Sequence, residues 1–429
     1  MKMLASLVAA FKLPDLRKRI LFLFIAFAVF AVGRHIPLPG IDREALSRLF
    51  ANNLFGFLDI FSGGALRQFT ILALGIMPYI NATIIFQLLT LAWPELQEMA
   101  REGETGRRKI AQYTRYLTMA LAMLQGFGLT MWLRQNGILS VSWATQCKIV
   151  LTLTAGTAFL MWLGEEMTDK GVGNGVSLLI FAGIMARIPQ DVWQTVLLVT
   201  SGSVSIFNAG LLAAIVFATI MGIVFIQQGE RRIPVQYAKR VVGTRMMGGA
   251  STYLPVKVNS AGVMPIIFAI SVALFPMTVA NFIPASSEGI WGDIVALIDR
   301  YLTPGKSTFA LVLYFALVVG FTYFYTAATF DPLDVADNMR KWGGFVPGIR
   351  PGRPTAEYLD RVLVRVTFAG AIFLGVIAVM QYVVPDITRV ASFSLVGGTS
   401  LLIVVGVALE TMQQIEAHLL MRHYEGFIK

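Results

Sequence analysis

The sequence predicts an all-α integral membrane protein that crosses the bilayer ten times. Of the 429 residues, 56% are hydrophobic and 14% are charged, whereas roughly a quarter of the residues of a soluble domain are charged. The mean hydropathy is +0.68. A chain of this length has room for many spans of roughly 20 residues each, but not also for a large soluble domain.

Ten stretches of the chain are predicted to form the spans because none of them contains Asp, Glu, Lys or Arg. These stretches are residues 20–33, 70–93, 116–133, 149–164, 176–186, 206–226, 259–281, 308–330, 366–384 and 394–409. The fifth is short, so its helix is expected to tilt or to borrow residues from the flanking loops. Ion-coupled transporters normally carry ionisable groups inside the membrane. Spans without such groups favour a passive conduit, gated by an apolar constriction.

Lys and Arg are distributed unevenly between the two sets of loops that alternate along the chain. The set that contains the N-terminus holds 25 of them, and the opposite set holds 10. Because short basic loops remain in the cytoplasm, this asymmetry predicts that both termini are cytoplasmic.

Residues 1–19 are predicted to form a cytoplasmic N-terminal surface helix. Their apolar run comes first and the basic cluster follows it, which is the reverse of the order in a secretory signal. We therefore expect residues 3–11 to lie in the membrane surface, with cleavage as the alternative.

Residues 53–93 change character twice within a short distance. Residues 53–69 are short, half apolar and rich in glycine, whereas residues 70–93 are long enough to cross the bilayer and contain Gly75 and Pro78 in their first half. Irregular backbone at membrane depth persists only where protein or a water-filled cavity satisfies its polar groups. The segment therefore either borders a pore or forms a loop helix on the outer surface, and the pattern alone fits both.

Two long basic loops, residues 229–258 and 329–365, lie on the predicted cytoplasmic side. The first has a net charge of +5. Paired Gly-Gly and Pro-Gly steps predict projecting hairpins in both loops, with arginines such as Arg350 near the tips. Such tips suit an acidic partner or a phosphate backbone, although the charge by itself is equally explained by membrane orientation and lipid contact.

Neither composition nor motifs indicate a catalytic, metal or cofactor site. The lone Cys147 excludes an internal disulfide, and three His with one Cys argue against a metal centre. Residues 171–175 resemble a dinucleotide-binding turn, but Val176 stands where the last glycine is needed and no strand precedes them. We therefore interpret them as a tight cytoplasmic turn before the fifth span. We expect no enzyme activity and no cofactor, so the energy for vectorial work has to come from a partner.

Eight short motifs occur along the chain in one unbroken order. They are IPLPG at 36–40, FSGGAL at 61–66, LGIMPYI at 74–80, EGETGRRK at 102–109, GVGNG at 171–175, STYLPVKVN at 251–259, VPGIRPG at 346–352 and GGTS at 397–400. Together they resemble the SecY family, the channel-forming subunits of the bacterial Sec protein translocon. The resemblance extends from about residue 20 to the C-terminus.

The resemblance implies two pseudo-symmetric, inverted five-helix halves, an architecture known among membrane proteins. The first half would be residues 20–186 and the second residues 206–416, with the external hinge loop 187–205 between them and the cytoplasmic tail 417–429 after them. Residues 54–68 would form a plug that seals the external funnel. Its central residues would be Phe57, Ile60, Phe61, Ser62, Gly63, Gly64, Ala65 and Leu66.

By the same resemblance, six branched apolar residues would form a pore ring, and three polar residues would contribute to a lateral gate. The ring would be Ile76, Ile80, Val176, Ile180, Ile267 and Ile403, and the gate residues would be Asn81, Thr83 and Gln87. Spacing of four residues places Ile76 over Ile80, and Val176 over Ile180, on one helix face. Polar pairs across the gate would be worth roughly 1 kcal/mol each. For Thr83, hydrogen bonding within its own helix is the alternative.

The resemblance also implies partners. The cytoplasmic loops would dock the SecA ATPase motor or the ribosome, through ribosomal RNA and proteins, with Arg350, Arg245, Arg240 and Lys239 as the contact residues. SecE, with SecG as a further partner, would be small subunits of the channel, and signal sequences, nascent polypeptides and membrane lipids would contact it. The implied function is a passive protein-conducting channel in the bacterial plasma membrane, which also releases hydrophobic segments sideways. The alternative is a secondary transporter of a small solute built on an inverted repeat.

Overall fold

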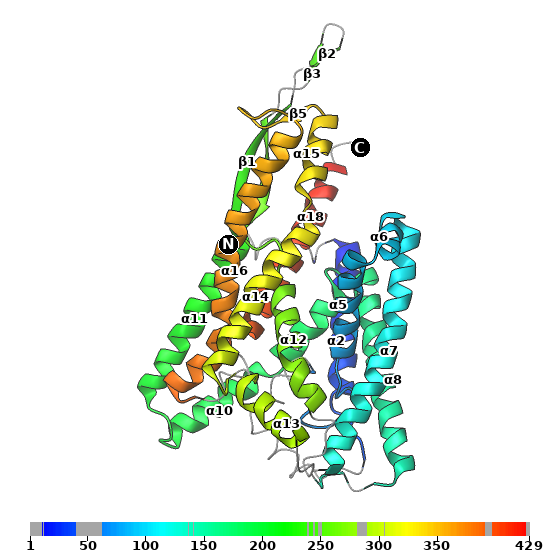
Figure 1. Cartoon of the computed structure of the whole chain (residues 1–429), viewed down its shortest axis with the longest axis vertical. Helices are drawn as coiled ribbons and strands as arrows, with labels where there is room; N and C mark the ends of the chain where they lie inside the picture. Colours follow the sequence, from blue (N-terminus) through cyan, green and yellow to red (C-terminus); the bar gives the residue numbers. More distant parts are fainter. Residues whose placement is uncertain are drawn as a thin grey trace.

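Each of the ten predicted spans contains an α-helix in the computed structural model (Figure 1). The structure describes residues 11, 13–39, 62–135, 137–139, 141–237, 240–242, 245–247, 251–280, 290–303, 305–390 and 397–425. The ten helices are α2 (Pro14–Gly33), α5 (Met77–Ala92), α7 (Glu104–Gln135), α8 (Trp143–Lys170), α9 (Gly175–Met185), α11 (Ile206–Gln228), α12 (Met264–Ala280), α14 (Thr308–Thr329), α16 (Arg353–Thr388) and α18 (Thr399–Glu425). The predicted surface helix at residues 3–11 lies almost entirely outside the described residues.

Seven helical segments among the described residues are long and apolar enough to cross a membrane. The other three predicted spans are α2, α5 and α12. Helix α2 carries three basic residues, Arg17, Lys18 and Arg19, near its start, and α5 and α12 have only 16 and 17 residues. Short spans are accommodated by flanking residues or by a locally thinner bilayer.

Helix α5 begins seven residues later than the predicted span 70–93. Residues 62–76 form consecutive turns instead. Gly75 adopts a φ of +58°, a left-handed conformation that interrupts a regular helix and favours glycine. Pro78 lies in the first turn of α5, where its missing N–H costs nothing. The prediction of a spanning helix from Thr70 was therefore wrong at its start, and the irregular backbone extends as far as Ile76.

One end of the helical bundle carries a small β-sheet. We call this end of the bundle the hairpin end. Strands β1 (Glu230–Tyr237) and β4 (Ser251–Lys257) pair antiparallel with Ile233 opposite Leu254. Strand β5 (Gly344–Phe345) adds to the other edge of β1, with Phe345 opposite Gln236. The short strands β2 (Arg240–Val242) and β3 (Arg245–Met247) extend the β1–β4 hairpin toward its tip (Figure 1). The projecting hairpin predicted for residues 229–258 is thus confirmed.

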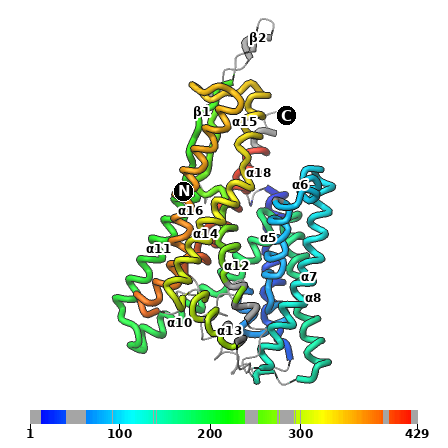
Figure 2. Tube along the Cα trace, viewed as in Figure 1, coloured from blue at the N-terminus to red at the C-terminus, as the bar shows by residue number. Residues whose placement is uncertain are grey.

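Residues 329–365 do not form a second hairpin, so that prediction was wrong. They fold as helix α15 (Pro332–Lys341), strand β5 and the first turns of α16. The Asp331 carboxylate caps α15 by accepting from the backbone N–H of Leu333 at 2.8 Å. Ile233, Val256 and Val346 pack with α16 in one buried cluster. Figure 2 shows the green β1 beside the orange start of α16, so the two basic loops form one unit.

The two predicted sets of loops lie at opposite ends of the bundle. Helices α6 (Pro94–Arg101) and α15 lie toward the hairpin end, whereas α10 (Ile188–Thr200) and α13 (Ile290–Tyr301) lie at the other end (Figure 1). We call that other end the α10 end. The expected hinge loop 187–205 contains α10, a helix of 13 residues. The connections between the spanning helices alternate between the two ends in the predicted order.

Glycines on the neighbouring helices α2 and α8 allow residues 71 and 72 to approach these helices closely. A Cβ atom built on Gly156 of α8 would overlap the carbonyl oxygen of Ile71, and one on Gly33 would lie 2.7 Å from Leu72 Cδ1. The carbonyl oxygen belongs to the main chain and cannot rotate away. Gly156 therefore sets the distance between α8 and the irregular segment.

Replacing Gly156 with Ala should lower the unfolding free energy by about 1–3 kcal/mol, the usual cost of overpacking a close contact. The measurement is thermal unfolding of the purified protein in detergent. Gly320→Ala is the matched control, because Gly320 is exposed on α14 and a Cβ there meets no atom within 4 Å. Equal unfolding temperatures for the two variants would contradict the contact.

Candidate functional site

Five of the six predicted ring residues are buried, and all six join one apolar cluster. Ile76 and Ile80 come from the start of α5, Ile180 from α9, Ile267 from α12 and Ile403 from α18. Each of these five is at most 5% exposed, and Val176 of α9 packs partly buried against the same cluster. The cluster therefore unites residues from both predicted halves.

Helix α9 is set by the glycine turn at residues 171–175. Gly173 has a φ of +95°, and the Asn174 side chain accepts from the backbone N–H of Ser177 at 3.1 Å as the N-cap. The N–H of Gly175 donates to Thr168 Oγ1 at 2.9 Å, so α8 fixes where α9 starts. The interpretation of residues 171–175 as a tight turn is confirmed, and the turn places Val176 in the first turn of α9.

Helix α18 is fixed by a buried polar pair that the sequence did not reveal. Thr399 Oγ1 donates to Gln381 Oε1 of α16 at 2.9 Å, and both residues are at most 2% exposed. A Cβ on Gly398 would overlap the carbonyl oxygen of Ile377. The GGTS motif marked this place, but nothing in the sequence identified Gln381 as its partner. These contacts position Ile403 one turn further along.

The structure describes residues 62–68 of the predicted plug, which we call the plug base, and much of this base is buried. Phe57, Ile60 and Phe61 lie outside the described residues, whereas Ser62, Gly63, Ala65 and Leu66 are buried and Gly64 is partly buried. Ser62 Oγ accepts from the backbone N–H of Leu66 at 3.1 Å. Ala65 belongs to the same cluster as the ring residues, and Leu66 to a second cluster that includes Phe69 and Leu133. The described end of the predicted plug thus packs beside the predicted ring residues.

The three predicted gate residues on α5 have different surroundings. Thr83 Oγ1 donates to the carbonyl oxygen of Tyr79 at 2.9 Å, so the alternative of bonding within its own helix holds for this hydroxyl. Asn81 Oδ1 and Gln87 Oε1 are buried and have no hydrogen-bond partner among the described residues. Two buried oxygens without partners leave α5 ready to accept donors from another chain or from a rearranged neighbour.

The predicted docking residues gather at the hairpin end. Arg350 is exposed between β5 and α16, in a segment where Gly348 and Gly352 have positive φ. Its backbone is held by Thr355 Oγ1, which donates to the Arg350 carbonyl oxygen at 2.8 Å. Arg240 and Arg245 lie on the paired strands β2 and β3, and Lys239 lies outside the described residues.

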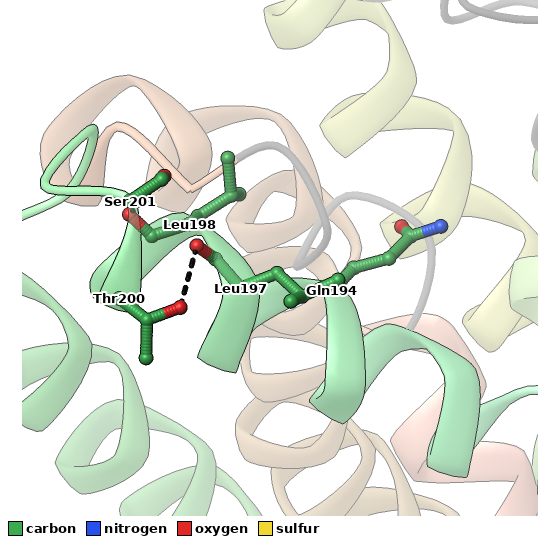
Figure 3. Close-up of a pocket in the computed structure, with 5 residues that line it drawn as sticks. All are labelled: Gln194, Leu197, Leu198, Thr200 and Ser201. Atoms are coloured by element: carbon green, nitrogen blue, oxygen red, sulfur yellow. Dashed lines mark hydrogen bonds between the residues drawn. The ribbon is translucent and has the colours of Figure 1, made fainter.

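Two pockets lie away from the ring. One of about 580 Å³ is formed by α10 and the residue after it, and is lined by Gln194, Leu197, Leu198, Thr200 and Ser201. Figure 3 shows the Gln194 side chain extending away from Thr200 and Ser201. The other, about 230 Å³, lies between the end of α11, the base of the β1–β4 hairpin and α18. None of the residues that line them is a predicted ring or plug residue.

Comparison with known proteins gives one consistent result. A family model described as SecY matches residues 70–412. A protein translocase subunit SecY of Streptomyces scabiei is 45% identical over an alignment that covers 100% of each chain.

Two solved structures resemble the fold. One is a SecY protein whose plug domain stabilises the closed state of the translocation channel and maintains a membrane seal, with a TM-score of 0.64. The other is Sec61 in the canine ribosome-channel complex from the endoplasmic reticulum, with a TM-score of 0.61. Each is 17% identical and covers 94% of this chain, which in turn covers 92% of that chain. By the identity and full-length coverage of its relatives, this chain belongs to the SecY family of protein translocase subunits.

Proposed function

We propose that the chain is the channel-forming subunit through which unfolded preproteins cross a membrane. The observation that carries the proposal is the apolar cluster in which ring positions from α5, α9, α12 and α18 meet beside the plug base. Branched apolar side chains offer ions no hydration. They can also close around an extended polypeptide of any sequence, since they need no specific partner. The channel is passive, and a partner supplies the energy.

We further propose that the ring and the plug together seal the closed channel. The double variant Ile80→Gly with Ile180→Gly removes two side chains from the ring, and deletion of residues 57–66 removes the centre of the plug. Each change should raise ion leakage through vesicles that contain the purified complex, by about tenfold or more.

Ile85→Gly is the matched control for the ring. Ile85 lies on α5 and is 37% exposed, so its replacement has the same cost in helix propensity as Ile80→Gly alone but leaves the ring intact. Unchanged conductance in the double variant and in the deletion would refute the assigned ring and plug.

Lateral release of hydrophobic segments is proposed to occur beside α5, at Asn81 and Gln87. Their unpartnered buried oxygens make the closed seam less stable there than a fully bonded one. A photocrosslinker placed at residue 87 should capture a signal sequence during insertion, whereas one at the exposed Phe217 of α11 should not. Equal labelling at both positions would contradict this location of the gate.

We propose that the hairpin end faces the cytoplasm of a bacterium, with both termini on that side and the chain in the plasma membrane. The excess of Lys and Arg in these loops supports that orientation. The exposed Arg350 at this end suits the SecA motor or the ribosome as a docking partner, and SecE and SecG would complete the channel in the membrane. The pseudo-symmetric halves 20–186 and 206–416 are part of the same proposal.

Arg350→Glu should reduce import of a signal-bearing preprotein into vesicles by tenfold or more when SecA and ATP drive it, because a charge reversal repels the acidic groups that the arginine binds. Arg300→Glu is the control, since it makes the same charge change at the exposed end of α13, on the opposite side. Normal import by Arg350→Glu would remove this residue from the docking surface. Accumulation of a small solute without any preprotein import would favour the transporter alternative.

A further inference from the structure

A charged side chain holds the base of the proposed plug, and none of the family motifs includes it. Arg34 is the first residue after α2, and its Nη1 donates to the carbonyl oxygen of Gly63 at 2.6 Å. The two residues are 29 positions apart in the chain. Hydrogen bonds from a guanidinium group are shorter and roughly twice as strong as those between neutral groups. Arg34 is only partly buried, so water can replace the carbonyl oxygen when the bond breaks.

Gly63 is confined from its other side by α9. It has a φ of +66°, and a Cβ built on it would lie 2.8 Å from Gly183 Cα. Gly64 has a φ of +87°, and its Cβ would lie 4.0 Å from Arg187 Cδ. The positive φ favours glycine at both positions, and at Gly63 the close backbone approach also leaves no room for a Cβ. The Gly63 backbone is therefore held between the end of α2 and the end of α9.

The chain after Arg34 also fixes the point where the plug segment joins the pore wall. The N–H of Leu38 donates to the Phe69 carbonyl oxygen at 3.0 Å, and the N–H of Ile71 donates to the Ile36 carbonyl oxygen at 3.0 Å. Residues 34–38 thus bind both ends of the segment 63–71. The backbone bonds at residues 69–71 need no particular side chain, whereas the bond at Gly63 depends entirely on Arg34.

We propose that Arg34 is a positioning residue that latches the plug in its closed place. This inference rests on the proposed plug. Displacing residues 62–66 breaks the bond between Arg34 and Gly63 and opens the contact between Gly63 and Gly183, so both interactions favour the closed state. Arg34 remains charged at every physiological pH. The latch is therefore released by mechanical displacement or by competition with an incoming chain, and not by protonation.

The test uses the full chain with its partner subunits in vesicles, and ion leakage as the readout. Arg34→Gln should raise the leak about tenfold, because a hydrogen bond to a charged group shifts an equilibrium by about that factor. Arg34→Lys keeps one cationic donor and should restore much of the seal. His35→Ala changes the exposed neighbouring residue and should leak no more than the unaltered protein.

Deletion of residues 57–66 distinguishes a latch from a general structural role. If Arg34 acts through the plug, adding Arg34→Gln to the deletion should cause no further leak. An additive leak, or no rescue by Arg34→Lys, would overturn the latch because Arg34 would then act elsewhere. The latch would also be overturned if the deletion leaks and Arg34→Gln alone does not, but that result would still support the proposed plug. A deletion that does not leak would overturn both the plug and the latch.

Discussion

The irregular backbone between the predicted plug and α5 imposes the constraint on which the rest of this structure depends. Residues 62–76 form turns in a protein that spans a membrane, and lipid offers their N–H and C=O groups no partners. The segment satisfies some of these groups itself, as in the bond from the Thr70 N–H to the Ala65 carbonyl oxygen at 3.0 Å. Others are satisfied by residues 36–38 and by Arg34. Glycines on α2, α7 and α8 let these helices approach close enough to enclose it.

The places of the predicted ring residues follow from where helices begin. Ile76 is the N-cap of α5, directly after the left-handed Gly75, and Val176 is the second residue of α9, after the turn at Gly173. Ile403 follows the start of α18, where Gly398 is left-handed and packs on α16. The start of α9 is fixed by contacts to α8, and the start of α18 by contacts to α16. Apolar side chains make no directional bonds that could fix their positions. The positions of the predicted ring side chains therefore depend on the backbone that carries them.

Helix α16 connects two regions that the sequence keeps apart. Its first turns pack on the β-sheet through Leu359 and Leu363, and its later part holds α18 through Gln381. At 36 residues it is long enough to extend from the hairpin end through the whole bundle. The exposed Arg350 lies immediately before it. A partner at the proposed docking surface would therefore contact the same structural unit that positions Ile403 of the predicted ring.

The sequence by itself determined the membrane class, the number of spans and their order, because charge-free runs and the Lys and Arg asymmetry are local consequences of the bilayer. Its motifs were specific enough to indicate the family, and the turn at residues 171–175 could be predicted because its chemistry is local. The start of α5, the fold of residues 329–365 and the surroundings of Asn81 and Gln87 were decided by tertiary structure. So were the Gln381–Thr399 pair and the bond from Arg34 to Gly63. Each depends on residues far apart in the chain, which hydropathy and spacing do not relate to one another.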